Sequence, residues 1–393
     1  MKVNIIGKAM AVGFAVAVAM AAIAVPASAD PTTADDYRLL TGVGSDTTQD
    51  AVNALGNVIL SGGAKVVASW DARGTSPIKT KAAGCSYVRP NGSGAGRQAL
   101  RASEGENLGG THGGPGFFNG VDIRGCVDFA RSSSYGGSSP SPTGTYTYIP
   151  MGVDAVALAI NSNNLDLPLN MSLSQVQRVY KCFSNNVGGN RVTPRMIQAD
   201  SGTWQFWIGP TRMAITEAEI NLGDYPCLAA DTDSNPGTPA VPVFPREQEH
   251  DGTPLAGNLN HVIPFSAAQF IAQTNRASIQ TLTGVAVADR RGPALLTGMS
   301  TTTQPATQPI VGGRLNTNFP MRRDVYNVVP TADLTNQLIA DTFVGAGSAV
   351  CTATVNDGGT QRNVVQLLGF GQRTTTVNAL EAACGYTDLR ANS

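Results

Sequence analysis

A nearly unbroken apolar run at residues 153–160 is the feature that most limits how this chain can fold. Such a run is typical of a strand covered on both faces, because a strand with one face in water alternates apolar and polar residues. Segments with helical spacing of apolar residues follow residues 45 and 172, between this strand and other expected strands. The alternation of strands and helices predicts an α/β fold with mostly parallel sheets flanked by helices.

The start of the chain has the pattern of an export signal. Two lysines precede a stretch rich in Ala and Val at residues 10–25, and small residues lead to an expected cleavage site after Ala29. The apolar stretch is shorter than the ~20 residues needed to cross a bilayer. We therefore predict a signal peptide at 1–29 and a secreted product, with cell-wall association left open. A lipid anchor is not expected, because Asp30 stands where the anchor would need a cysteine.

Six cysteines, an even number, indicate disulfide bonds in an exported chain. They fall into three well-separated sequential couples. We predict the bonds Cys85–Cys126, Cys182–Cys227 and Cys351–Cys384, each of which closes a loop of roughly 30–45 residues. The alternative use of cysteine is a zinc site, but the sequence has no CxxC or HxxxH spacing to support one. We expect neither a metal nor a cofactor.

The charged residues do not make the chain strongly acidic or strongly basic. The formal net charge is −1, and charged residues make up only 14% of the chain. Because proteins that bind nucleic acid normally carry clustered Lys and Arg, which this sequence lacks, we expect no nucleic-acid partner. Removal of residues 1–29 leaves roughly 360 residues, which suits two domains of ordinary size.

Two segments share one design, in which a strand leads through a Gly-containing turn with hydroxyl residues into a helix. They are residues 44–48 and 200–203. A helix N-terminus offers unpaired N–H groups and a partial positive charge, and Ser and Thr add hydroxyl donors at the same point. One such turn alone is more often an ordinary helix cap. Two of them in an α/β chain favour an anion site, since ligands gather at the carboxyl ends of parallel strands.

A series of motifs extends along most of residues 37–330. It comprises residues 41–49, 69–77, 89–96, 128–133, 149–160, 198–203, 249–253 and 263–273. In type and order these motifs resemble the phosphate-binding branch of the substrate-binding proteins of ABC transporters (PstS-like proteins), particularly its secreted actinobacterial members. The resemblance implies a two-lobed periplasmic-binding-protein-like (type II) fold with the ligand buried between the lobes. Lobe I would hold residues 30–147 and 325–393, and lobe II would hold residues 148–324.

The resemblance also implies donor residues on both lobes. In the first lobe they are Ser45 and Thr47, with Ser76 and its neighbour Thr75 in the next hydroxyl turn; in the second they are Ser201, Gly202 and Thr203.

Two positions depart from the family pattern. Ser133 stands where the family has the Asp that accepts the proton of hydrogen phosphate, and Ile197 stands where it has an Arg. Arg131, Arg89 or Arg97 could restore the cation, and Asp46 or Asp200 could restore the acceptor. Phosphate is therefore the first expectation among small oxyanions.

Together these observations predict a binding protein without enzymatic activity, monomeric, with an ABC-transporter permease as a candidate partner. Two alternatives stay open. One is a secreted or wall-associated surface protein that uses the fold for adhesion or assembly. The other is a secreted phosphoesterase or glycan hydrolase, for which residues 247–251, including His250, would be the acid/base or metal group. We interpret that segment instead as a solvated or cleft-edge loop.

Overall fold

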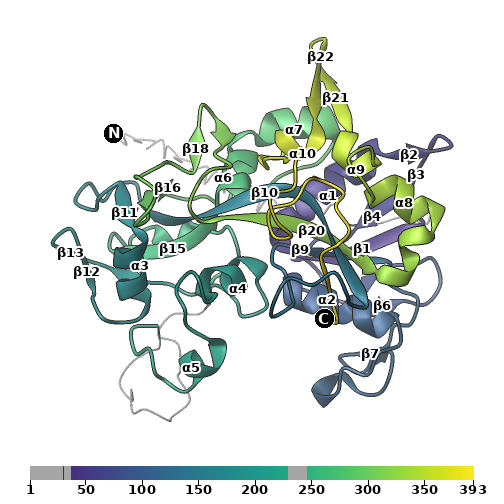
Figure 1. Ribbon diagram of the computed structural model, residues 1–393, viewed down its shortest axis with the longest axis horizontal. Helices are drawn as coiled ribbons and strands as arrows, with labels where there is room; N and C mark the ends of the chain where they lie inside the picture. Colours follow the sequence, from purple (N-terminus) through teal and green to yellow (C-terminus); the bar gives the residue numbers. More distant parts are fainter. Residues whose placement is uncertain (1–29, 31–36, 229–245) are drawn as a thin grey trace, which may run out of the picture.

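The computed structural model describes residue 30, residues 37–228 and residues 246–393. The predicted signal peptide, residues 1–29, lies outside the described residues. Figure 1 shows two groups of elements, with the long strands β10 (Tyr146–Asn161) and β20 (Arg322–Pro330) extending between them. The N-terminal and C-terminal elements, purple, blue and yellow, lie on one side. Most of the teal and green elements from the middle of the chain lie on the other side.

The central sheet has the strand order β14-β15-β10-β20-β9-β1-β4. Strands at both ends pair in parallel, and the crossing strands β10 and β20 pair antiparallel with each other and with their neighbours β15 and β9. All 16 residues of β10 are buried, in agreement with the apolar run at its centre. The α/β fold predicted from the sequence is confirmed. The other strands of this sheet are β1 (Leu40–Gly44), β4 (Val67–Ser69), β9 (Phe129–Ser132), β14 (Thr193–Pro194), β15 (His261–Ser266), β16 (Ala294–Leu296) and β23 (Arg390–Ala391).

Among the described helices of seven or more residues, four begin directly after a serine. They are α1 (Asp46–Val58), α3 (Leu173–Tyr180), α4 (Gly202–Ile208) and α6 (Ala267–Thr274), preceded by Ser45, Ser172, Ser201 and Ser266. In the last three, the serine hydroxyl accepts a hydrogen bond from the first helical turn. The further helices are α2 (Ser93–Ser103), α5 (Glu217–Asn221), α7 (Arg276–Thr283), α8 (Gln337–Phe343), α9 (Ala349–Thr352) and α10 (Val364–Leu367), with 3-10 turns at Gly110–His112, Thr253–Leu255 and Thr331–Thr335.

In the described residues, seven short two-stranded sheets lie outside the central sheet. They are β2 (Leu60–Ser61) with β3 (Ala64–Lys65), β5 (Ile78–Lys79) with β6 (Ser86–Tyr87), β7 (Phe117–Phe118) with β8 (Val121–Asp122), β11 (Asn170–Ser172) with β17 (Gly298–Ser300), β12 (Asn186–Val187) with β13 (Asn190–Arg191), β18 (Ile310–Val311) with β19 (Arg314–Leu315), and β21 (Thr354–Asp357) with β22 (Thr360–Asn363). Within the ranges that the structure describes, no helix is both long and apolar enough to span a bilayer.

The buried apolar side chains form three clusters. One cluster draws only on residues 155–321 and contains Trp204 and Trp207 at its centre. The other two draw on the N-terminal residues and on the chain after residue 324. Residues 268–287, which include most of α6 and all of α7, place their buried side chains in one of these two clusters. The clusters therefore separate the two groups of elements, except that α6 and α7 connect them. The lobe boundaries stated above stay a prediction.

The three predicted disulfide bonds are present, Cys85–Cys126, Cys182–Cys227 and Cys351–Cys384. The last joins α9 to the C-terminal tail, whose strand β23 pairs with β10. We expect Cys351→Ala with Cys384→Ala to lower the free energy of unfolding by about 2–5 kcal/mol, because the unfolded chain regains the entropy of an open loop. Urea titration of the oxidised protein measures this. An unchanged midpoint and slope would contradict it.

Candidate functional site

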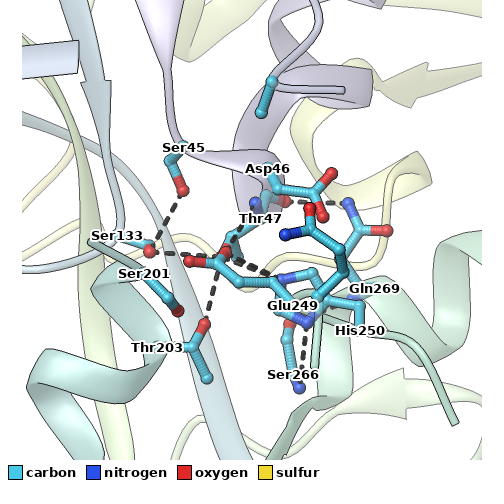
Figure 2. A network of polar contacts seen from close by, with 12 residues as sticks. Ser45, Asp46, Thr47, Ser133, Ser201, Thr203, Glu249, His250, Ser266 and Gln269 are labelled. Carbon is cyan, nitrogen blue, oxygen red and sulfur yellow. Dashed lines mark hydrogen bonds and ion pairs between the residues drawn. The ribbon is translucent and has the colours of Figure 1, made fainter. Parts of the chain in front are cut away.

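Two of the predicted turns meet at the centre of the molecule, at the starts of α1 and α4. Oγ1 of Thr47 lies 3.2 Å from Oγ1 of Thr203, although 156 positions separate the two residues. Oγ of Ser133, just after β9, lies 3.1 Å from both Oγ of Ser45 and Oγ1 of Thr47. We call Ser45, Thr47, Ser133 and Thr203 the hydroxyl cluster; Figure 2 shows their side chains directed toward one another. All four residues are fully buried, so their protons must find partners within the protein.

The turn before α1 needs a glycine. Gly44 has φ +122°, and a Cβ at this position would stand 2.5 Å from the carbonyl oxygen of Arg131 on the neighbouring strand. This close approach lets the backbone N–H of Ser45 donate to the same carbonyl at 3.1 Å. Ser45 is therefore fixed at the end of β1 with its hydroxyl facing Ser133.

Hydrogen bonds between the two groups of elements lie next to the hydroxyl cluster. The backbone N–H of Gly94, at the start of α2, donates to the carbonyl of Asp200 at 3.0 Å. Asn91 and Gln198 exchange side-chain amide hydrogen bonds at 2.9 and 3.0 Å. Among the residues before β10, Ser93 accepts a hydrogen bond from the backbone N–H of Ser133 at 3.0 Å. The bonds of Gly94 with Asp200 and of Asn91 with Gln198 join residues before and after β10 directly, beside the cluster.

A buried carboxylate, that of Glu249, occupies the centre of this arrangement (Figure 2). Its Oε2 accepts from the hydroxyl of Thr47 at 2.7 Å and from the backbone N–H of Thr47 at 3.2 Å. That N–H belongs to the first turn of α1, where backbone donors have no helical partner. Burial alone would raise the pKa of Glu249, but the hydrogen bonds from His250 and Thr47 outweigh it and hold the pKa well below the ordinary value. The carboxylate is therefore ionised.

His250 also donates a hydrogen bond to Oε2 of Glu249. Its Nδ1 lies 3.4 Å from the backbone nitrogen of Ser266, which can only donate, so Nδ1 accepts and Nε2 carries the hydrogen. Nε2 lies 3.2 Å from Oε2 of Glu249 and 2.9 Å from Oγ1 of Thr47. In this tautomer His250 stabilises an anion and cannot take a proton from Thr47 through Nε2. The geometry suits anion binding better than nucleophilic catalysis.

The cation of the site is Arg323, on the crossing strand β20. Its Nη2 donates to Oγ1 of Thr203 at 2.8 Å and to Oδ2 of Asp154 at 2.9 Å. Asp154 lies opposite Arg323 on β10 in the strand register and also accepts from the hydroxyl of Ser266 and the backbone N–H of Ala268 at the start of α6. Nη1 of Arg323 is buried and has no hydrogen-bond partner among the residues that the structure describes.

Six of the eleven predicted ligand residues belong to this region. They are the four residues of the hydroxyl cluster together with Ser201 and Gly202. Gly202 is required there, because a Cβ would collide with the hydroxyls of Ser93 and Ser133. Ser201 caps α4 by accepting from the backbone N–H of Trp204 at 3.0 Å.

Two further predicted residues have structural partners close by. Asp46 begins α1, but its carboxylate pairs with Arg290 at 3.0 Å. Arg131 is fully buried and donates to the carbonyls of Gly44 and Ser45, so it supports the turn from inside. Its burial lowers the pKa of its guanidinium to about 10.

The last three predicted residues, Thr75, Ser76 and Arg89, form a group of their own. Arg89 donates to Asp30 at 3.0 and 2.5 Å and to the carbonyl of Thr75 at 2.8 Å. Its backbone N–H donates to the hydroxyl of Ser76 at 3.1 Å. Thr75 and Ser76 are exposed. In the described part of the chain, these three residues make no hydrogen bond with the hydroxyl cluster or Glu249.

Sequence reasoning placed residues 249–253 in the motif series but assigned no binding role to the charged members of the site. The segment containing Glu249 and His250 was interpreted as a solvated or cleft-edge loop; a solvated loop is wrong, because both side chains are fully buried. Arg323 belongs to none of the motifs recognised in the sequence. The signal that could have led to it is Asp154, the single charge inside the apolar run, since a buried carboxylate requires a partner. The described residues contain no group of His, Cys, Asp or Glu side chains arranged to hold a metal ion.

No family model and no curated protein matches this chain. Several solved structures are similar to it. An ABC-type phosphate transport receptor from Vibrio cholerae has a TM-score of 0.41 at 16% identity, over 77% of this chain and 92% of its own. A putative phosphate ABC transporter substrate-binding protein from Clostridium perfringens, solved with bound phosphate, has a TM-score of 0.43 at 14% identity, over 79% and 95%. A phosphate-binding protein from Stenotrophomonas maltophilia has a TM-score of 0.39 at 12% identity, over 88% and 91%. The ligand proposed for this chain therefore rests on its own residues.

Proposed function

We propose that this chain is a secreted, monomeric solute-binding protein that holds a small oxyanion, phosphate first, between its two groups of elements and performs no chemistry. The groups would correspond to lobe I, residues 30–147 and 325–393, and lobe II, residues 148–324. An ABC-transporter permease is the proposed recipient of the solute. The observation that carries the proposal is that a fully buried, ionised carboxylate already lies among donors from both sides of the molecule.

The donor set fits an oxyanion for two physical reasons. The backbone N–H of Thr47, Nε2–H of His250 and the guanidinium of Arg323 are fixed before any solute arrives, so little ordering entropy is lost on binding. The hydroxyl cluster can either donate or accept, because a hydroxyl proton rotates to suit its partner. A partly protonated oxyanion such as hydrogen phosphate presents both kinds of oxygen, which makes phosphate the first candidate.

We expect Thr203→Val and Thr47→Val each to weaken phosphate binding roughly tenfold or more, because each removes one hydroxyl hydrogen bond to a charged ligand. Valine keeps the shape of the side chain, so packing changes little. Isothermal titration calorimetry with inorganic phosphate up to the millimolar range gives the dissociation constants. Melting temperatures at several phosphate concentrations give an independent estimate through RT ln(1 + [L]/Kd).

Thr75→Val is the matched control for both variants. It makes the same chemical change on an exposed residue outside the hydroxyl cluster, and it should leave phosphate affinity unchanged. Equal affinities in all three variants and the wild type would refute this site. Turnover of a generic phosphate ester by the wild type would point to the hydrolase alternative. Absence of binding in both the wild type and the Glu249 variant described next would leave the surface-protein alternative.

A further inference from the structure

We propose that the Glu249 carboxylate is a built-in occupant of the oxyanion site, and that a solute binds by displacing it. The inference rests on the proposed function and adds a regulatory element to it, because the Glu249 side chain competes with the solute for the site. Glu249 lies outside the motifs that form the hydroxyl cluster and reaches the cluster from the segment just before the 3-10 turn at Thr253–Leu255.

The position of Oε2 is that of a ligand oxygen. It accepts from a first-turn N–H of α1, a thirteen-residue helix, at 3.2 Å and from the hydroxyl of Thr47 at 2.7 Å. His250 adds a third donor at 3.2 Å. An anion bound at a helix N-terminus by backbone N–H groups and hydroxyls has these partners. Glu249 therefore satisfies the donors that a free oxyanion would need.

Glu249 does not provide a hydrogen-bond partner for every polar atom at the site, and this favours its exchange for a solute. Its second oxygen, Oε1, is buried and has no hydrogen-bond partner in the ranges that the structure describes. The same holds for Nη1 of Arg323, which connects to Glu249 through the hydroxyls of Thr203 and Thr47. A tetrahedral oxyanion carries more oxygens than a carboxylate and can satisfy Nη1 of Arg323, the donor that Glu249 leaves unpaired. Each unpaired buried polar group has a free-energy cost, so this difference favours the solute.

A solute oxygen and Oε2 of Glu249 cannot accept from the same donors at the same time. Glu249 is ionised, because these hydrogen bonds hold its pKa well below the ordinary value. A second anion at the same donors would meet a like charge at close range in a buried environment, where Coulomb repulsion is strong. Binding of an oxyanion to these donors therefore requires Oε2 of Glu249 to leave them, and the apparent affinity is reduced by the fraction of molecules in which Glu249 occupies the site.

The backbone at the next residue is consistent with a displaceable arrangement. His250 has φ +58°, in the left-handed region that side chains other than glycine adopt at a cost. The contacts of Glu249 and His250 with the cluster offset this cost in the occupied state. When a solute replaces those contacts, the segment is free to relax to an ordinary conformation.

The test is Glu249→Gln, which preserves the size of the side chain and removes its charge. We expect phosphate to bind this variant at least tenfold more tightly than it binds the wild type, as measured by calorimetry with inorganic phosphate. Asp251→Asn is the matched control. It removes one charge two residues away, and asparagine can still accept the hydrogen bonds that Asp251 receives from Thr253. Its affinity should equal that of the wild type.

The outcomes separate this inference from the proposed function. Equal or weaker phosphate binding by E249Q, with binding by the wild type, would overturn the occupancy of the site by Glu249 and leave the proposed function intact. No binding by either protein would overturn both. A gain in E249Q and an equal gain in D251N would mean that only the net charge matters, which also overturns the inference.

A second measurement uses the wild type, in case E249Q does not fold. The chain has three histidines. Addition of phosphate should shift the Hε1 proton resonance of His250, because its Nε2 loses the Glu249 partner, and should leave the resonances of His112 and His261 in place. A phosphate complex in which the His250 resonance does not move would overturn the inference.

Discussion

Replacement of Arg323 by methionine is expected to lower the free energy of unfolding by about 3–5 kcal/mol, the usual cost of removing one partner of a buried ion pair. Asp154 is fully buried, and the side chain of Arg323 is only 3% exposed. Methionine fills much of the volume of arginine but leaves the carboxylate without its countercharge. The remaining donors to Asp154, Ser266 and Ala268, are neutral groups.

Urea unfolding measures this change, and Arg322→Met is the matched control. Arg322 is the neighbouring residue, with a side chain 30% exposed and paired with Glu381 near the surface, so its loss should cost at most about 1 kcal/mol. Asp154→Asn combined with Arg323→Met should recover part of the stability, because no buried charge is then left alone. If the two single arginine variants were equally stable, the ion pair would not have the role described here.

The pH dependence of stability should reveal Asp50. Burial, followed by the nearby charge of Asp71, raises the pKa of this carboxyl from 3.8 to about 7 in the folded protein. Between about pH 4 and pH 7 the unfolded chain has released this proton while the folded chain still binds it. The folded state therefore loses stability as pH rises through this window, by roughly 4 kcal/mol in total for a shift of this size. Below about pH 4 the group contributes no such change.

Unfolding of Asp50→Asn at a series of pH values provides the test. The neutral amide resembles the protonated carboxyl, so the variant should be more stable than the wild type at pH 8 and close to it at pH 4. Asp341→Asn, at an exposed position on α8, is the control and should follow the wild-type curve. Parallel curves for the wild type and Asp50→Asn between pH 4 and pH 8 would rule out a raised pKa at Asp50.

The sequence predicted the parts of the site that are set by local structure. Ser45 and Ser201 precede helices, and such turns follow from a hydroxyl next to a run with helical spacing. The approach of Thr47 to Thr203 followed from a general rule, that ligand-binding turns gather at the same end of an α/β sheet. The three disulfide pairs followed from the spacing of the cysteines. Each of these inferences needed only short-range pattern or a rule of topology.

The charged groups of the site could not be found in this way. Glu249 and His250 come from an acidic segment whose composition is typical of a solvated loop, and only tertiary contacts with α1 bury them. Arg323 faces Thr203 because β10 and β20 pair in one particular register, which no local pattern in the sequence specifies. Arg131 and Arg89 were plausible by residue type alone, but their hydrogen bonds go to backbone carbonyls, to the hydroxyl of Ser69 and to Asp30.

The strand register that pairs Asp154 with Arg323 also has a mechanical consequence. Both residues belong to the two strands that extend between the groups of elements, and the ladder between those strands fixes their separation. A rotation of one group against the other would carry Thr47 and Thr203 apart but would leave this pair intact. In the proposed binding protein, the guanidinium would therefore keep its position on β20 while the two groups separate.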